Sequence, residues 1–310
     1  MPNRILELAE SAASLRIDNG LLVVGRRGQP DATFPPQDVA VIVVAHPEVT
    51  YTQAVVAGLA ASGGVLVHCD RARLPVALTL PLTGHHVLGE RMRQQAAISR
   101  PTAKRLWKQV VQAKIAGQQA VLEQLGRGPA LLEGYRTRVR SGDPENVEAQ
   151  AARRYWGLLF SDPSFRRDQD GGAQNAALNY GYAVLRAVVA RAVCAAGLHP
   201  GLGLHHHNRY DPHALASDLM EVLRPLVDLL VVNDPSRTPP GGDLTQDQRR
   251  HLLQGLLGKV VMEGEHRTLF DASARMATSL VKVVQGDAEA LLLPDVCATL
   301  RVQDSTGTAP

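Results

Sequence analysis

The sequence predicts an α+β protein, with a small N-terminal β-rich domain that contains one helix and a larger all-α C-terminal domain. Short β-branched runs bounded by turn residues fill roughly the first 80 residues, which is typical of strands. From about Val87 onward, apolar residues instead recur at the i, i+3, i+4 spacing of helices. The 310 residues show no internal repeat, so we expect two domains of different kinds.

The N-terminal part reads as strands around a single helix. Asn19-Gly20 separates two β-rich runs in SLRIDNGLLVVG, which predicts a hairpin. The run DVAVIVVAHP predicts a short strand that Pro47 ends. The segment TYTQAVVAGLAASGG predicts one helix closed by Gly63-Gly64, and VLVHCD and PVALTL predict two further strands.

The C-terminal part is predicted to be helical. Apolar spacing predicts helices near residues 87–99, 101–125, 144–160, 173–196, 212–231, 246–261 and 266–285. The Pro- and Gly-rich stretch 234–243 predicts a loop. We therefore expect three parts, namely a β-rich domain at 1–84, an α-helical domain at 85–300 and a flexible tail at 301–310.

Basic residues are concentrated in the middle of the chain. The whole chain has a net charge of only +3, and residues 1–84 carry 6 basic and 7 acidic side chains. Residues 91–168 carry 15 basic and 7 acidic side chains, a net charge of +8. This pattern is typical of a surface that faces phosphates, although an ordinary solvated helix surface gives the same pattern.

Several protein classes are disfavoured by the remaining composition. Cys69, Cys194 and Cys297 are far apart and odd in number, so they predict neither a disulfide framework nor a cysteine metal site. The start MPNRILELAES lacks the basic residues and long apolar run of a signal peptide. The sequence has no uninterrupted run of about 18 apolar residues, so it predicts no membrane span. We therefore expect a cytoplasmic protein.

Two acidic residues share one face of the helix predicted after Pro212. Asp211-Pro212 is a helix cap followed by proline at the first helical position. Asp218 and Glu221 lie at i, i+3 on this helix among apolar neighbours. A buried carboxylate needs a cation or hydrogen bonds, and a divalent metal would supply the cation. The alternative is a solvated surface pair.

A third acidic residue follows a similar helix start. Asp143-Pro144 precedes Glu148, whose helical face continues with alanines and Tyr155. Small neighbours leave room for an ion and a phosphate beside the carboxylate. The alternative is a solvated or ion-paired Glu148, and the histidines at 205–207 are by themselves equally consistent with a polar loop.

Five segments in order resemble one family. They are CDRARLP (69–75), NVEAQAARRYW (146–156), NAALNYGYAVL (175–185), GLHHHN (203–208) and ASDLMEVLRPLVD (216–228). Together they resemble the CRISPR adaptation integrase, the first CRISPR-associated protein, with the last two segments most similar to members from type II systems. The resemblance covers roughly residues 1–290, and it implies the same division into a β domain and an α domain.

The resemblance implies a metal site made of Glu148, His206 and Glu221, which would also be the catalytic residues. Glu148 falls on the glutamate of the family's E-x-x-A-A-x-x-Y motif. Counting back from ASDLME places the family histidine on His206, between His205 and His207. This chain has Glu221 where many relatives have aspartate. Members from type II-like systems often have glutamate at this position as well. The implied cofactor is Mg²⁺ or Mn²⁺.

Other residues are assigned supporting and binding roles. Asp218 is a near neighbour of Glu221 or an alternative ligand, and Asn179 and Tyr155 are further supporting residues. We expect basic side chains to hold DNA through its phosphates. These candidates are Arg91, Arg93, Lys104, Arg105, Lys108, Arg153 and Arg154.

The implied activity is integration of short foreign DNA into a CRISPR repeat. A 3′-hydroxyl would attack a phosphodiester, so no nucleophilic side chain is expected. By the same resemblance the protein is a homodimer formed through residues 1–84, and its partner is a small ferredoxin-like second adaptation protein. A further type II adaptation subunit and the RNA-guided effector nuclease are additional partners.

Three alternative functions use the same residues differently. A general metal-dependent DNA nuclease would use water in place of the 3′-hydroxyl. A non-catalytic DNA-binding scaffold would need no metal ligands, and a zinc-dependent hydrolase of small molecules would not need the basic surface.

Overall fold

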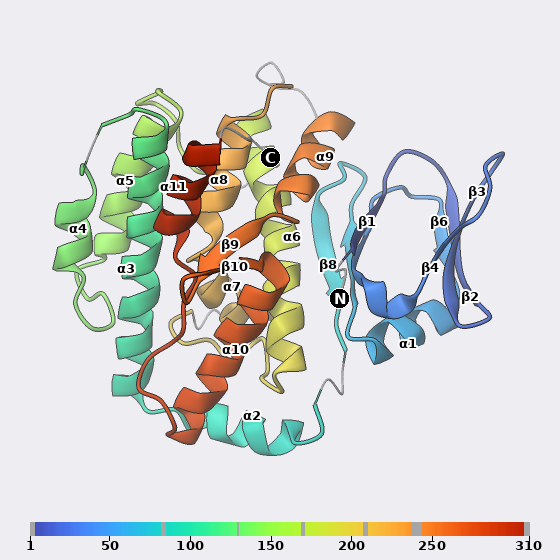
Figure 1. Cartoon of the computed structure of the whole chain (residues 1–310), viewed down its shortest axis with the longest axis horizontal. Helices are drawn as coiled ribbons and strands as arrows, with labels where there is room; N and C mark the ends of the chain where they lie inside the picture. Colours follow the sequence, from blue (N-terminus) through green and yellow to red (C-terminus); the bar gives the residue numbers. More distant parts are fainter. Residues whose placement is uncertain are drawn as a thin grey trace.

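The structure of the chain is a computed structural model. It describes residues 4–81, 85–128, 130–168, 171–206, 210–236 and 244–306, with the side chains of 302–306 excepted. The strand-rich N-terminal part lies beside a larger helical part (Figure 1). This mixed α/β arrangement confirms the predicted fold class.

The N-terminal part contains two four-stranded sheets. One has the order β1-β5-β7-β8 and the other the order β4-β3-β2-β6. The elements are β1 (Arg4–Leu8), β2 (Ala13–Asp18), β3 (Leu21–Arg26), β4 (Ala32–Phe34), η1 (Pro36–Asp38), β5 (Val39–Val44), β6 (Val49–Tyr51), α1 (Gln53–Ala61), β7 (Val65–Cys69) and β8 (Pro75–Thr79). The predicted hairpin is confirmed, because β2 and β3 pair antiparallel across Asn19-Gly20, both with positive φ.

Strand β5 is buried on both faces, as expected for a strand flanked by two parallel neighbours. Ile42 packs with the second sheet and α1, whereas Val41 and Val43 belong to the same core as the helices. The main hydrophobic core therefore continues from the helical part onto one face of the first sheet.

The helical part surrounds α6 (Ala173–Ala195), which contacts α7, α8, α9, α10 and strands of the first sheet (Figure 1). The other elements are α2 (Leu88–Ala96), α3 (Arg100–Gln124), α4 (Glu133–Arg138), α5 (Val147–Leu159), α7 (Ala214–Met220), α8 (Arg224–Val232), α9 (Gln246–Gly255), β9 (Lys259–Met262), β10 (Glu265–Thr268), α10 (Leu269–Gln285) and α11 (Val296–Thr306). No helix among the described residues is both long and apolar enough to cross a bilayer.

The prediction of one continuous helix over 212–231 is wrong. The structure has two helices, because α7 ends at Met220 and α8 begins at Arg224. Pro225 occupies the first turn of α8, where its missing N–H costs nothing. The same proline would break a continuous helix, so the chain turns just before it and places Glu221 at the junction.

The all-helical prediction for the C-terminal part also needs two corrections. Strands β9 and β10 form an antiparallel hairpin where helices were expected around 261 and 266. Glu263 and Gly264 both have positive φ, which gives the tight turn that suits a two-residue hairpin. At the end of the chain, α11 continues into the predicted tail as far as Thr306, since buried Val296 and Leu300 anchor its first turns.

Candidate functional site

Glu148 is placed by the local structure at the start of α5. The Asp143 carboxylate accepts hydrogen bonds from the backbone N–H groups of Val147 and Glu148, each at 2.9 Å. The prediction that Asp143 directly caps the helix is wrong in detail, because Asn146 is the N-cap residue, with φ of 50°. Asp143 instead satisfies the free N–H groups of the first turn from four residues upstream of Val147.

Glu148 and Glu221 meet at one lysine. Nζ of Lys114, on α3, lies 2.5 Å from Oε1 of Glu148 and 2.5 Å from Oε2 of Glu221. Helix α3 contacts both α5 and α7, so it can carry a side chain between them. The Lys114 side chain is only 7% exposed and that of Glu221 only 6%. Two carboxylates distant in sequence therefore share one cation.

Asp218 is fully buried and holds the histidine segment against α7. Its carboxylate accepts hydrogen bonds from the backbone N–H groups of Leu204, His205 and His206, at 2.6, 2.9 and 3.3 Å. It also lies 2.5 Å from Nδ1 of His206. The close packing of the histidine segment around Asp218 needs a glycine at Gly203, because an added Cβ would lie 2.5 Å from the carbonyl oxygen of His206.

His206 lies close enough to the two glutamates for their charges to act on its ring. The hydrogen bond from Asp218 raises the pKa of His206 above its ordinary value, burial opposes this rise, and the charges of Glu221 and Glu148 add to it. Because Nδ1 faces Asp218, Nε2 is the ring nitrogen left for another partner. The interpretation of Asp218 and Glu221 as a solvated surface pair is therefore wrong, because both are at most 5% exposed.

The neighbouring His205 has a different place. Its ring stacks on Trp107 with centroids 4.3 Å apart and an interplanar angle of 3°. The ring of His206 is nearly perpendicular to the same Trp107 ring, with the two ring centroids 5.5 Å apart. His207, the third histidine of the triplet, lies outside the described residues. The two described histidines are thus distinguished by their contacts, with His206 on the acidic side and His205 on the indole.

A buried polar network extends from Glu221 into the core. Nη1 of Arg224 donates to Oε1 of Glu221 at 2.6 Å, and the guanidinium lies 4.1 Å from the ring centroid of Tyr182. The hydroxyls of Tyr182 and Tyr155 both donate to the carboxylate of Asp228. The predicted supporting residue Tyr155 is therefore linked to Glu221 through Asp228, Tyr182 and Arg224.

The charges in this network set the protonation of Glu221. Burial by itself would raise the pKa of its carboxyl group, but Arg224 and Lys114 outweigh burial and lower that pKa to about 2. Burial raises the pKa of Asp228 to about 6, against the opposing hydrogen bond from Tyr182. Glu221 is therefore an anion at neutral pH, available to a cation.

Sequence reasoning missed Lys114, Arg224 and Tyr182 as parts of this site. Lys114 follows Val110 and Val111 on the apolar face of α3, and a lone lysine within such a face was the available signal. The predicted supporting residue Asn179 does not reach the glutamates in any described contact. Its Oδ1 accepts a hydrogen bond from Arg167 at 2.5 Å.

The predicted DNA-binding residues fall on α2, α3 and α5. Five of the seven are exposed, Lys108 is half-buried, and the half-buried Arg91 donates to the carbonyl of Ala196 at 2.5 Å. Arg91 therefore joins α2 to the end of α6. The exposed members are Arg93, Lys104, Arg105, Arg153 and Arg154.

The donor atoms at this site suit a divalent cation. Within the described part of the chain no three His, Cys, Asp or Glu side chains form a ready metal cluster, and Lys114 lies between the glutamates instead. Oε2 of Glu221 is buried, and its partner is the ammonium of Lys114 at 2.5 Å. Two carboxylates and one imidazole nitrogen are ligands that magnesium and manganese accept.

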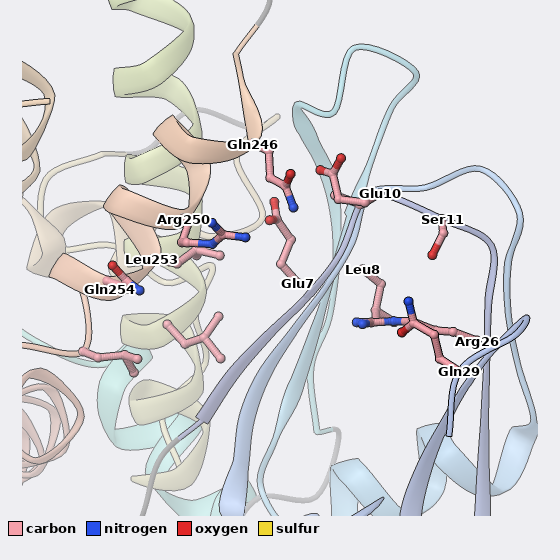
Figure 2. Close-up of a pocket in the computed structure, with 13 residues that line it drawn as sticks. Glu7, Leu8, Glu10, Ser11, Arg26, Gln29, Gln246, Arg250, Leu253 and Gln254 are labelled. Carbon is pink, nitrogen blue, oxygen red and sulfur yellow. The ribbon is translucent and has the colours of Figure 1, made fainter. Parts of the chain in front are cut away.

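A separate pocket of about 480 Å³ lies between β1 and α9 (Figure 2). Glu7, Gln246 and Arg250 line it, and Figure 2 shows them on facing elements. Beside this pocket the fully buried Arg249 pairs with Glu7 at 2.8 Å. The site at Lys114 is therefore distinct from this junction between strands and helices.

The sequence of this chain is similar to those of one known protein family. The family model for "CRISPR associated protein Cas1" matches residues 6–237. A CRISPR-associated endonuclease Cas1 from Neisseria meningitidis is 35% identical over 292 residues, which cover 93% of this chain and 95% of the relative. A second relative, a CRISPR-associated endonuclease Cas1 from Pyrobaculum aerophilum, is 30% identical and covers 89% of this chain and 98% of its own length.

Solved structures of the same fold include a casposase bound to integration product, with a TM-score of 0.78, 21% identity, and coverage of 93% of this chain and 92% of that chain. A Cas1 protein from Thermotoga maritima has a TM-score of 0.75, 18% identity, and coverage of 92% and 97%. A chain of a Cas6-RT-Cas1–Cas2 complex has a TM-score of 0.71, 19% identity, and coverage of 94% and 36%. The family match and the 35% identity together assign this chain to the Cas1 family of CRISPR-associated proteins.

Proposed function

We propose that this protein is a metal-dependent DNA integrase of CRISPR adaptation. It joins the 3′-hydroxyl ends of short foreign DNA to a CRISPR repeat. The observation that carries the proposal is the meeting of Glu148 and Glu221 at Lys114, with His206 close enough for both glutamates to raise the pKa of its ring. The family relatives named as endonucleases, and the fold shared with a casposase bound to integration product, support this class of reaction.

In the proposed reaction the 3′-oxygen of the incoming strand forms a bond to phosphorus. The bond from phosphorus to the 3′-oxygen of the target strand breaks, and that oxygen leaves with a proton. Glu148, Glu221 and Nε2 of His206 would hold Mg²⁺ or Mn²⁺. Such a cation, when bound, activates an attacking hydroxyl and neutralises charge on the phosphate oxygens.

The chain's own residues prepare the site for this reaction. Asp218 fixes the ring of His206 through Nδ1, so that Nε2 points away from α7. Arg224 keeps Glu221 ionised. The exposed arginines and lysines of α2, α3 and α5 would hold the DNA backbone, with strongly salt-dependent affinity.

We propose that the protein forms a homodimer, and that this homodimer acts together with the second adaptation protein. A structure described as a Cas6-RT-Cas1–Cas2 complex and one described as a Cas1–DNA complex from a similar fold support Cas2 and DNA as partners. Two active sites, one in each of two flanking dimers, suit a fragment that must be joined at both ends. Further type II partners would join this assembly.

The test is strand transfer into a supercoiled plasmid that carries a CRISPR array. Labelled duplex with 3′-hydroxyl ends is incubated with Cas2, Mn²⁺ and either the wild-type protein or Glu148→Ala. We expect label joined to plasmid with the wild type and a loss of roughly 100-fold or more with the variant, the scale seen when one transition-state-stabilising group is removed. Glu145→Ala, which removes an exposed carboxylate three residues earlier, is the matched control.

Three results would contradict the proposal. Nicking of the plasmid without joining would identify a nuclease. Equal joining by the wild type and Glu148→Ala would exclude Glu148 from the chemistry and favour a scaffold role. Joining that needs Zn²⁺ and fails with Mn²⁺ and Mg²⁺ would replace the proposed cation.

A further inference from the structure

Lys114 has the charge and the position of a bound cation. Its ammonium lies 2.5 Å from one oxygen of Glu148 and 2.5 Å from one oxygen of Glu221. The side chain is buried on α3 beside the apolar Val110 and Val111. Burial lowers the pKa of Lys114, but Glu221 and Glu148 outweigh it, so the pKa remains above its ordinary value and the ammonium is charged.

The charges of Glu148 and Glu221 are matched by those of two basic side chains. Glu148 and Glu221 contribute two negative charges, and Lys114 and Arg224 contribute two positive charges. A buried ion pair is tolerated when its partners are matched in this way. A divalent cation added between the same carboxylates would leave an excess of two positive charges, so one of the resident cations must give way.

Lys114 is the resident cation that can move. Arg224 is held twice, by its hydrogen bond to Oε1 of Glu221 and by its contact with the Tyr182 ring. Lys114 instead contacts Glu148 and Glu221, which are the two carboxylates that a metal would take. Its four-carbon stem is flexible, whereas the planar guanidinium of an arginine is committed to fixed geometry.

We propose that Lys114 is an internal counter-cation that holds Glu148 and Glu221 together in the metal-free protein, and that a divalent metal binds by displacing its ammonium from between them. This inference rests on the metal site of the proposed function. It assigns Lys114 a positioning role, in which it holds the two carboxylates close together but weakens the affinity for metal.

The first test measures Mn²⁺ affinity of the full chain without DNA. Free Mn²⁺ is followed by electron paramagnetic resonance for the wild type, Lys114→Met and Lys259→Met. Lys259 is an exposed lysine on β9, so its variant matches the change in net charge away from the site. We expect the Kd for Mn²⁺ to fall at least tenfold in Lys114→Met and to stay within threefold of the wild type in Lys259→Met.

A second measurement uses the wild-type protein and does not depend on a variant that folds. Amine-specific labelling is followed at each lysine by mass spectrometry, with and without Mn²⁺. We expect labelling of Lys114 to accelerate severalfold when Mn²⁺ is added, because the displaced ammonium leaves its carboxylate partners, while labelling of Lys259 does not change. A constant labelling rate at Lys114 with Mn²⁺ bound would overturn the displacement.

The variants Glu148→Ala and Glu221→Ala separate this inference from the proposed function. If both lose Mn²⁺ binding while Lys114→Met binds with wild-type or weaker affinity, the metal site stands and the role of Lys114 is refuted. If Mn²⁺ binding is unchanged in both glutamate variants, the metal site itself is refuted. If neither the wild type nor Lys114→Met binds Mn²⁺, both proposals fail, because the variant lacks the lysine that is proposed to compete with the ion for Glu148 and Glu221.

Discussion

At the scale of single residues, the histidine segment shows how neighbours of the same type take different roles. Asp218 accepts hydrogen bonds from three backbone N–H groups and faces Nδ1 of His206. Its oxygens are therefore already used by the chain. This makes Asp218 a residue that orients His206 and leaves Glu221, whose carboxylate is bonded to side-chain cations and to no backbone N–H group among the described contacts, as the second acidic candidate for a metal.

We predict that His206→Ala and His205→Ala have unequal effects on strand joining. His206→Ala removes the ring that faces the glutamates and should reduce joined product roughly 100-fold or more. His205→Ala removes a stacking contact with Trp107, worth about 0.5–1.5 kcal/mol of stability, and should retain much of the activity. The measurement is the plasmid strand-transfer assay, with thermal unfolding of each variant beside it.

The same assay applied to His207→Ala completes the series, and we expect this variant to retain much of the activity. Equal losses from all three variants would contradict the assignment of His206. A larger loss from His205→Ala than from His206→Ala, at equal thermal stability, would move the assignment to His205.

At the scale of elements, the site depends on how helices begin and end. Helix α5 starts with N–H groups of its first turn bonded to Asp143, and α7 ends at Met220, shortly before α8 begins at Arg224 with Pro225 in its first turn. Glu148 therefore lies in the first turn of one helix and Glu221 just beyond the end of another. Helix α3 lies against both ends and carries Lys114 to the place where they meet.

We predict that Asp143→Ala lowers the free energy of unfolding by about 1–2 kcal/mol, because it removes the acceptor of two N–H groups at the start of α5. Urea denaturation of the full chain measures this change. Glu145→Ala, in which the lost carboxylate is exposed and paired with arginine on the surface, should change the same quantity by less than about 1 kcal/mol. Similar values for the two variants would mean that Asp143 does not stabilise the helix.

At the scale of the whole molecule, one buried arginine links the strand-rich part to the helices. Arg249 of α9 is 0% exposed and pairs with Glu7 at the end of β1 and with Glu10 just beyond it. The hydroxyl of Tyr180 on α6 also donates to Glu7, at 2.8 Å. These contacts join β1 to α6 and to α9, whose contacting residues are 173 and 242 positions from Glu7, alongside the shared core on β5.

We predict that Arg249→Met lowers the free energy of unfolding by about 3–5 kcal/mol, because it leaves the half-buried Glu7 without its cationic partner. Chemical denaturation measures the change. Arg250→Met is the matched control, since Arg250 is the next residue and its side chain is 58% exposed in a surface pair, worth about 0–1 kcal/mol. A loss below about 1 kcal/mol for Arg249→Met would show that the link contributes little to stability.

The sequence by itself determined the fold class, most helix positions and the three segments that supply Glu148, His206 and Glu221. These follow from local information, because apolar periodicity, turn residues and ordered motifs lie within short windows of the chain. The hairpin at Glu263-Gly264 had a local signal as well, but the helical periodicity around it hid that signal. The break before Pro225 was likewise readable from the proline alone.

Only the tertiary structure decided which charges pair. Lys114 and Glu148 are separated by 34 positions and Tyr155 and Asp228 by 73, so no spacing rule links them. Burial decided the rest, because a carboxylate in low dielectric must find a partner whatever its distance along the chain. The order of residues thus determined the fold class of this Cas1 protein and the segments that supply its site. Packing determined that a lysine lies where the metal is proposed to bind.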